Sequence, residues 1–173
     1  MRVKLGVVTA LVVTAALAAV PTAAVAAPTS TTFTVSGVET AFSSTSATFT
    51  GRGSGNAGDR AAWAVSITRT RFDAAGRSTI TGGTFTMRTI SPTWTTDWVT
   101  GTVAGGFVQK IAGFTGCTNE RFSVSVSLAD VATKTSTGGT GSFAGELTHH
   151  RTSIFGACVT YGATITGVVT LSY

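Results

Sequence analysis

The stretch Phe122-Ser123-Val124-Ser125-Val126-Ser127-Leu128 places apolar side chains at even positions and serines at odd positions. Successive side chains of an extended strand point to opposite faces of a sheet, so this alternation predicts a strand with one buried face and one wet face. The same alternation recurs in residues 63–68 and 163–173, where threonine joins serine on the wet face. β-Branched threonine suits a pleated strand, and its hydroxyl can face water. The repeated pattern predicts an all-β protein.

Working outward from these runs, further segments carry strand signals, and turn signals separate them. The clearest turn is Asp73-Ala74-Ala75-Gly76, and Gly105-Gly106 marks another expected break. No window longer than eight residues shows a convincing helical period. Eight to ten short strands at this spacing predict a closed antiparallel barrel or, as the alternative, a two-sheet sandwich. The additional expected strands are Thr31–Glu39, Ser46–Arg52, Thr79–Thr89, Thr93–Ala104, Phe107–Ala112 and Ser142–Arg151.

Two features favour the barrel over the sandwich. Glycine inside a strand usually marks a bulge or a sharp bend, which barrel corners require. The last strand runs to the chain end, and barrel closure removes an edge that would otherwise promote aggregation. The glycines expected inside strands are Gly37, Gly82, Gly101, Gly145 and Gly167.

The composition excludes several classes of protein. Charged residues make up 11% of the 173-residue chain, too few for a nucleic-acid binder that works by charge density or for a coiled coil. Hydrophobic residues make up 43%, which argues against intrinsic disorder. Thr and Ser account for 48 of residues 27–173, a content that is also found in disordered, glycosylated stalks. Here they alternate with large apolar residues, which indicates strands and not a stalk. No repeat or linker divides the chain, so residues 27–173 are expected to form one domain.

The first residues have the pattern of a secretory signal peptide. Arg2 and Lys4 form a basic head, an apolar run follows as far as Pro21, and Ala24-Val25-Ala26 supplies an A-x-A cleavage site. The sixteen residues between Lys4 and Pro21 are fewer than the ~20 that a spanning helix needs, which argues against the alternative of a membrane anchor. The sequence therefore predicts cleavage after Ala26, a secreted protein, and no membrane association afterwards.

Cys117 and Cys158 are the two cysteines of the chain, and each follows a Phe three residues earlier. In an exported protein an even cysteine count predicts a disulfide. The alternatives are a pair of free thiols or a metal site, which would need further ligands such as His149 and His150. We expect the disulfide, with both cysteines in adjacent loops at one barrel end, and no metal or cofactor.

Few residues of the predicted domain suit acid–base chemistry. His149 shares the strand parity of Phe143 and is expected to point inward, whereas His150 faces out. Glu39 shares the parity of the apolar residues before it and could reach the lumen, and Asp97 lies between two tryptophans. A carboxylate on an apolar wall has a raised pKa and can act as a proton donor. The alternative for all of them is a structural position near a strand end.

Two arginines and several aromatic residues complete the candidate ligand contacts. Arg69 and Arg71 continue an inward-facing parity and either line a barrel mouth or belong to a solvated hairpin tip. Inward aromatic side chains are expected to line an apolar lumen. The candidate lumen residues are Trp63, Phe85, Trp94, Phe143 and His149, with Trp98 as a further aromatic.

The run Gly139-Thr140-Gly141-Ser142-Phe143-Ala144-Gly145 resembles the G-x-G-x-F-A-G segment of dirigent proteins and of the related allene oxide cyclase-like barrels. This resemblance implies an eight-stranded antiparallel barrel with a largely apolar lumen, and it carries over no catalytic residue. The predicted domain as a whole also resembles uncharacterised secreted proteins of actinobacteria, which implies export and a β fold.

Three functions remain open at this stage. The first is a barrel that binds a small apolar or aromatic molecule in a lumen open at one end. The second is a ligand-free extracellular module that is structural or binds a partner. The third is a cyclase-like enzyme with His149, Glu39 or Asp97 as its ionisable group. A lumen larger than ~300 Å³ favours ligand binding or catalysis, and a filled one favours the module. Nucleic acid is not an expected partner, and the oligomeric state is not predicted.

Overall fold

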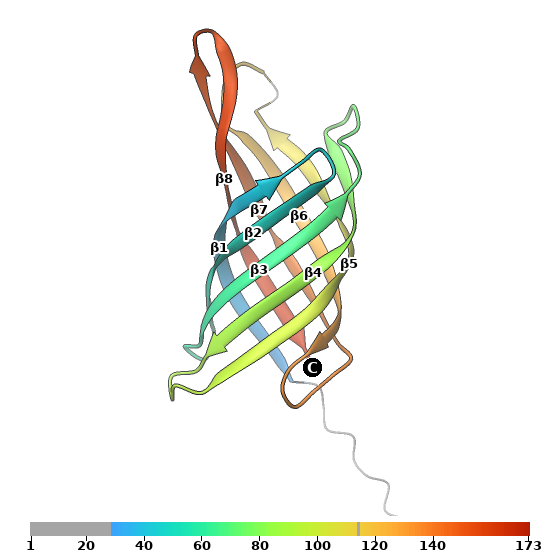
Figure 1. The fold of residues 1–173 in the computed structure, drawn as a ribbon, viewed down its shortest axis with the longest axis vertical. Coiled ribbons are helices and arrows are strands. Elements are labelled where there is room, and N and C mark those ends of the chain that lie inside the picture. Colours follow the sequence, from blue (N-terminus) through green and yellow to red (C-terminus); the bar gives the residue numbers. More distant parts are fainter. Residues whose placement is uncertain (1–28, 114) are drawn as a thin grey trace, which may run out of the picture.

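The computed structural model describes residues 29–113 and 115–173, and the predicted signal segment 1–26 lies outside them. The described residues form a closed antiparallel barrel of eight strands, as the alternation predicts, and not a two-sheet sandwich. Each strand pairs with the next along the chain, and β8 pairs with β1 to close the barrel (Figure 1). The strands are β1 (Ser30–Phe42), β2 (Ser46–Gly55), β3 (Arg60–Arg69), β4 (Arg77–Ile90), β5 (Thr96–Ala112), β6 (Glu120–Ala132), β7 (Gly139–Ile154) and β8 (Ala157–Ser172).

The strand alternation divides the side chains between the inside and the outside of the barrel. Phe122, Val124, Val126 and Leu128 of β6 are buried in the interior, as the serine alternation predicts. Outside, hydroxyls of neighbouring strands meet, for example Thr48 and Ser66 with oxygens 3.1 Å apart. The wall therefore keeps its hydroxyls in water while the apolar face forms one continuous core.

The region around Gly105-Gly106 differs from the sequence expectation. Two strands are predicted there, at Thr93–Ala104 and Phe107–Ala112, but the structure has the single strand β5. The strand continues through Gly105 and Gly106 without a turn, and their φ values of +157° and +146° are ones that glycine adopts readily. The pairing with β6 shifts register between Val103 and Gly105, so the glycines mark a β-bulge. β5 also begins at Thr96, because residues 91–95 form a loop.

Glycines inside the strands serve two purposes. Gly101 lies at a register shift between β5 and β6, and Gly82 adjoins one between β3 and β4, as expected for bulges. Gly37, Gly145 and Gly167 instead make room for aromatic rings. A Cβ at Gly37 would lie 2.6 Å from the Trp63 ring, and one at Gly145 would lie 2.5 Å from the Phe143 ring.

The barrel has two different ends. At the terminal end lie the start of β1 and the end of β8, together with the loops after β2, β4 and β6 (Figure 1). At the hairpin end, the β7–β8 hairpin projects beyond the other strands (Figure 1). The pairing of β1 with β8 stops at Val38 and Thr164, and that of β6 with β7 at Glu120 and His149. Beyond these residues the hairpin is a two-stranded ribbon with both edges unpaired.

A disulfide joins the projecting hairpin to the loop between β5 and β6. Cys117 and Cys158 are bonded with their Cα atoms 5.4 Å apart, which confirms the predicted pair at one barrel end. Cys117 lies in a loop as expected, but Cys158 lies in β8, because this strand already begins at Ala157. The backbone N–H of Arg151 also donates to Asn119 Oδ1 at 3.0 Å. The ribbon is thus attached to the barrel at two points besides its own strands. Among the described residues, no helix is long and apolar enough to cross a membrane.

Candidate functional site

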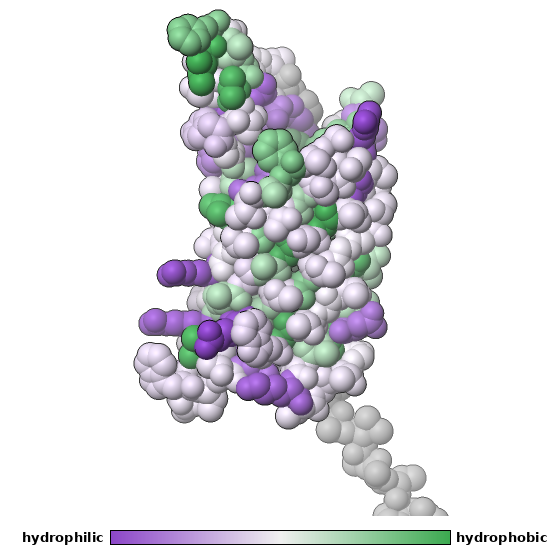
Figure 2. All heavy atoms as spheres, viewed as in Figure 1, coloured by the Kyte–Doolittle hydropathy of each residue, from purple (hydrophilic) through white to green (hydrophobic). Residues whose placement is uncertain are grey.

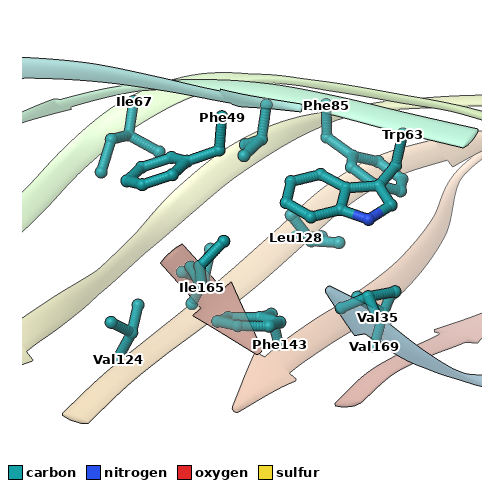
Figure 3. A pocket seen from close by; sticks show the side chains of 12 residues that line it. Val35, Phe49, Trp63, Ile67, Phe85, Val124, Leu128, Phe143, Ile165 and Val169 are labelled. Carbon is teal, nitrogen blue, oxygen red and sulfur yellow. The ribbon is translucent and has the colours of Figure 1, made fainter. Parts of the chain in front are cut away.

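The lumen, where the sequence predicts a ligand site, is almost filled by its own side chains. Trp63, Phe85 and Phe143 do line an interior cavity, as predicted, but its volume is about 50 Å³ (Figure 3). Pockets for small-molecule ligands are typically ~300–1,000 Å³. The expected open lumen is therefore not present, and the remaining space holds a few atoms. The cavity is lined by Val35, Phe49, Trp63, Val65, Ile67, Phe85, Val124, Val126, Leu128, Phe143, Ile165 and Val169.

Large aromatic rings over glycines explain why the lumen is filled. The Trp63 indole packs against Gly37 and Gly51, where an added Cβ would lie 2.6 Å from its ring, and its Nε1 donates to the carbonyl of Arg52 at 3.1 Å. On the other side, the Phe143 ring packs against Gly145 and Gly167. Because glycine has no side chain, each of these positions leaves space that an aromatic ring occupies. Large and small residues therefore pack closely together, as in other protein cores.

Two candidate residues lie outside the lumen. Trp94 was expected among the lumen residues, but it belongs to the loop between β4 and β5, and 82% of its surface is exposed. The strand parity misled here, because residues 91–95 are not in a strand. Asp97 lies at the same terminal end, where its Oδ1 accepts from the Trp98 N–H at 2.7 Å. Trp98 is itself 54% exposed.

At the hairpin end, several predicted ionisable residues come together inside the barrel mouth. His149 of β7 points inward, with Nε2 3.8 Å from Glu39 Oε2 and Nδ1 3.8 Å from Glu120 Oε2. Its ring also packs against Phe122, with ring centroids 5.0 Å apart. Arg69 adjoins the same mouth, with its guanidinium 4.6 Å from the centroid of the Phe72 ring. The inward parity of Glu39, Arg69 and His149 is confirmed.

Glu120 is the centre of an ion-pair network that sequence reasoning missed. Its Oε1 lies 2.5 Å from Lys110 Nζ and 3.1 Å from the Arg151 guanidinium. Glu120 begins β6 and shares the even parity of Phe122 and Val124, so the alternation of this strand is the signal that could have marked it as inward. The neighbouring Arg121 instead pairs with Glu146 on the outside of the barrel at 2.6 Å. That outer pair lowers the pKa of Glu146 through hydrogen bonds from Arg121.

Burial changes the titration of the two central groups in opposite directions. Burial raises the pKa of Glu39, and the positive charge of Arg69 opposes this in part. Burial lowers the pKa of His149, and the negative charge of Glu120 opposes this. His149 Nε2 is buried without a hydrogen-bond partner. Both pKa shifts favour the neutral forms of Glu39 and His149.

A second small cavity lies beneath this charged mouth. Its volume is about 30 Å³, enough for one or two water molecules, and Glu39, Arg69 and His149 contribute its polar lining. It shares Phe49, Ile67, Val124 and Ile165 with the interior cavity, so the two are neighbours along the barrel axis. The described residues contain no group of three or more His, Cys, Asp or Glu side chains that could hold a metal ion.

The remaining predicted residues lie outside the mouth. His150 points outward, where its Nε2 lies 3.0 Å from Thr164 Oγ1 and its ring 6.0 Å from that of Tyr161. Arg71 is exposed in the loop between β3 and β4. Of the two positions expected for this residue, it therefore occupies the solvated hairpin tip and not the barrel mouth.

Comparison of this chain with protein-family models, curated proteins and solved structures gave no match.

Proposed function

We propose that the protein is exported, is cleaved after Ala26, and works as an extracellular binding module whose contacts are made at the ends of the barrel. The observation that carries this proposal is the interior cavity of about 50 Å³. A lumen that binds a ligand keeps a several-fold larger pocket. Entry of a drug-sized apolar molecule would require both Trp63 and Phe143 to leave the glycines against which they pack.

The projecting hairpin supports contacts at the ends. Its turn residue Phe155 is fully exposed and has a φ of +49°, followed by Gly156 at +82°. Positive φ is unfavourable for a bulky side chain, and Asn-Gly would fit this two-residue turn without strain. Alternation also places Ile154, Val159 and Tyr161 on the outward face, opposite Cys158. Apolar surface gathers at this tip in Figure 2. A strained, exposed phenylalanine on a disulfide-anchored ribbon suits contact with a partner.

Export is supported by two independent features of the chain. The first 26 residues have the basic head, apolar run and A-x-A site of a signal peptide. The Cys117–Cys158 disulfide fits a protein that folds in an oxidising compartment.

The likeness to dirigent and allene oxide cyclase-like barrels rests on Gly139–Gly145 and would by itself favour a ligand in the lumen. In this chain, however, Phe143 and Gly145 of that motif take part in the packing that fills the lumen. We therefore extend the resemblance to the barrel architecture and not to ligand binding.

A fluorescence titration tests whether the lumen of the proposed binding module takes up an apolar ligand. In the variant Trp94→Phe/Trp98→Phe, Trp63 is the remaining tryptophan and reports on the lumen. We expect no change in Trp63 emission, and no enhancement of probe fluorescence, when the apolar probe 1-aminoanthracene is added. The positive control is Trp63→Ala, whose enlarged cavity should take up the probe. Saturable one-to-one uptake by the protein with Trp63 in place would overturn the proposal.

A second candidate function, acid–base catalysis at the hairpin mouth, is favoured by the unpartnered Nε2 of His149 beside Glu39. Hydrolysis of p-nitrophenyl acetate tests it. A catalysed rate that falls ~10²–10⁴-fold in His149→Ala, and survives in His150→Ala, would support catalysis. A rate equal to the uncatalysed background would leave this function without support.

A further inference from the structure

We propose that the terminal end of the barrel binds a neutral oligosaccharide, in a groove between the loop that carries Trp94 and the loop that carries Lys134. This inference rests on the proposed function, because it names the ligand class of one of the barrel ends. The groove begins as a hollow of about 330 Å³, within the range of ligand pockets. Phe33 and Tyr173 supply the apolar part of its lining.

The lining of this hollow has the chemistry that sugar hydroxyls require. Thr89, Ser91, Thr95 and Thr96 contribute hydroxyl groups to the lining. The hydroxyls of Ser91 and Thr95 are hydrogen-bonded to each other and can accept further hydrogen bonds. Carboxylates accept the strongest hydrogen bonds from hydroxyl donors, because their acceptor oxygens are charged. The two carboxylates of the hollow belong to Asp59 and Asp97.

The charges of the hollow, Asp59 and Asp97 against Lys134, leave one negative charge in excess, which disfavours anionic ligands. Lys134 lies beside Asp97, to whose Oδ1 its backbone N–H donates at 3.4 Å, and its Nζ donates to the Thr96 carbonyl at 2.6 Å. A phosphate or a nucleic acid would meet the two carboxylates, and an apolar ligand would remove water from at least six polar side chains without replacing those hydrogen bonds. A neutral molecule with many hydroxyls meets neither cost.

A neighbouring hollow extends the groove and supplies an aromatic face. It has a volume of about 300 Å³ and is lined by Arg60, Pro92 and Trp94 among others. The two hollows share Ser91, and Gly58 of one precedes Asp59 of the other in the chain. Together they offer room for more than one sugar ring. The electron-rich face of an indole attracts the partly positive C–H groups of a sugar.

The conformation of Trp94 supports a role in binding. It is 82% exposed and has a φ of +62°, a left-handed conformation that is unfavourable for a bulky residue. The loop itself is well ordered by its own hydrogen bonds. The Trp94 N–H donates to the Ser91 carbonyl, and the Ser91 N–H donates to the Thr95 carbonyl, both at 2.9 Å. Glycine or asparagine would serve this loop without strain, so nothing in the folding of the loop requires an indole here.

The test is a titration of the mature protein with four tetrasaccharides: chitotetraose, cellotetraose, maltotetraose and mannotetraose. The variant Trp63→Phe leaves Trp94 and Trp98, both at the terminal end, as the fluorescent reporters. At least one tetrasaccharide should shift their emission to the blue and saturate, with a Kd on the order of 0.1–1 mM.

Matched variants assign the binding to the groove, with isothermal calorimetry as the readout. Trp94→Ala should weaken binding roughly five- to tenfold through loss of the aromatic face. Asp97→Asn should weaken it about tenfold, because a charged acceptor is lost while Oδ1 can still accept from the Trp98 N–H. Val168→Ala, on the outer wall of the barrel and away from both ends, should leave the affinity unchanged.

Failure of this inference is distinguishable from failure of the proposed function. Absence of binding by all four tetrasaccharides up to roughly 10 mM, or binding that Trp94→Ala and Asp97→Asn leave intact, would overturn the groove alone. Uptake of 1-aminoanthracene by the lumen that still contains Trp63 would overturn the proposed function.

Discussion

The middle of the barrel and its two ends are built by different rules. In the middle, the aromatic rings of Trp63 and Phe143 pack against glycines across the lumen, and the remaining cavity is about 50 Å³. At the ends, aromatic side chains point into water, with Phe155 at one end and Trp94 at the other, and both have positive φ. In the middle of the barrel the large aromatic residues are therefore buried in packing, whereas at the ends they are exposed to solvent.

This difference supports the proposal that a partner contacts the ends of the barrel. A filled interior stabilises the fold but offers no room for a ligand. A strained and exposed aromatic residue opposes stability, and such a position usually reflects function. Recognition is therefore expected at the loops, on a barrel that serves as a rigid support.

The largest expected effect opens the middle of the barrel. Trp63→Ala removes a buried indole, and large-to-small changes of this kind cost about 3–5 kcal/mol. Chemical denaturation should show that loss, and addition of indole should restore part of it by filling the new cavity. A variant as stable as the original protein would show that Trp63 does not fill the lumen.

The next effect concerns the attachment of the hairpin end. The disulfide closes a loop with a sequence separation of 41 residues, for which chain entropy gives up to about 4 kcal/mol. The double variant Cys117→Ser/Cys158→Ser should melt at a lower temperature. It should also show faster amide hydrogen exchange in residues 150–163, while exchange in β3 and β4 stays slow near neutral pH. Equal acceleration throughout the barrel would contradict a local anchoring role.

A smaller effect, opposite in sign, is expected at the hairpin turn. Phe155→Asn places a residue that tolerates positive φ in the two-residue turn, so it should raise stability by about 1 kcal/mol. Thermal denaturation measures the gain, with Thr152→Asn on the same exposed ribbon as the control. If Phe155→Asn lowered stability, Phe155 would be packed against the barrel and not displayed.

The smallest expected effect is the pH response of the hairpin mouth. The pKa of His149 is lowered by burial, so the folded protein resists protonation there more than the unfolded chain does. Stability should therefore fall as the pH falls below the ordinary histidine pKa, and the decline should be shallower in His149→Asn. Glu39 acts in the opposite sense, because its raised pKa removes stability as the pH rises above the ordinary carboxyl value. His150→Asn, outside the barrel, is the control in urea titrations at several pH values.

The same division describes what the sequence could predict. In the middle, period-two alternation identifies the inward side chains, so the barrel, the inward Trp63 and the inward His149 follow from sequence. Alternation does not say how far a ring reaches across the lumen, so the pairing of rings with glycines, and hence the filled interior, required the structure.

At the ends, the signals in the sequence are weaker. Gly105-Gly106 has the composition of a turn but continues β5, because glycine suits both a turn and a bulge. Trp94 was expected in the lumen because its loop has the composition of a strand. Glu120 of β6 joins Lys110 of β5 with His149 and Arg151 of β7, and such a cluster from three strands has no local sequence signature. The cysteines are the exception, since compartment and even count predicted their bond.

Native mass spectrometry of the protein, recovered from the medium of cells that express the full chain, tests the central claim most directly. The account predicts the mass of residues 27–173 less two hydrogens for the disulfide, with no apolar molecule retained after purification. A protein that retains one apolar molecule per chain, which organic solvent then extracts, would contradict the filled lumen. It would also contradict the assignment of recognition to the barrel ends.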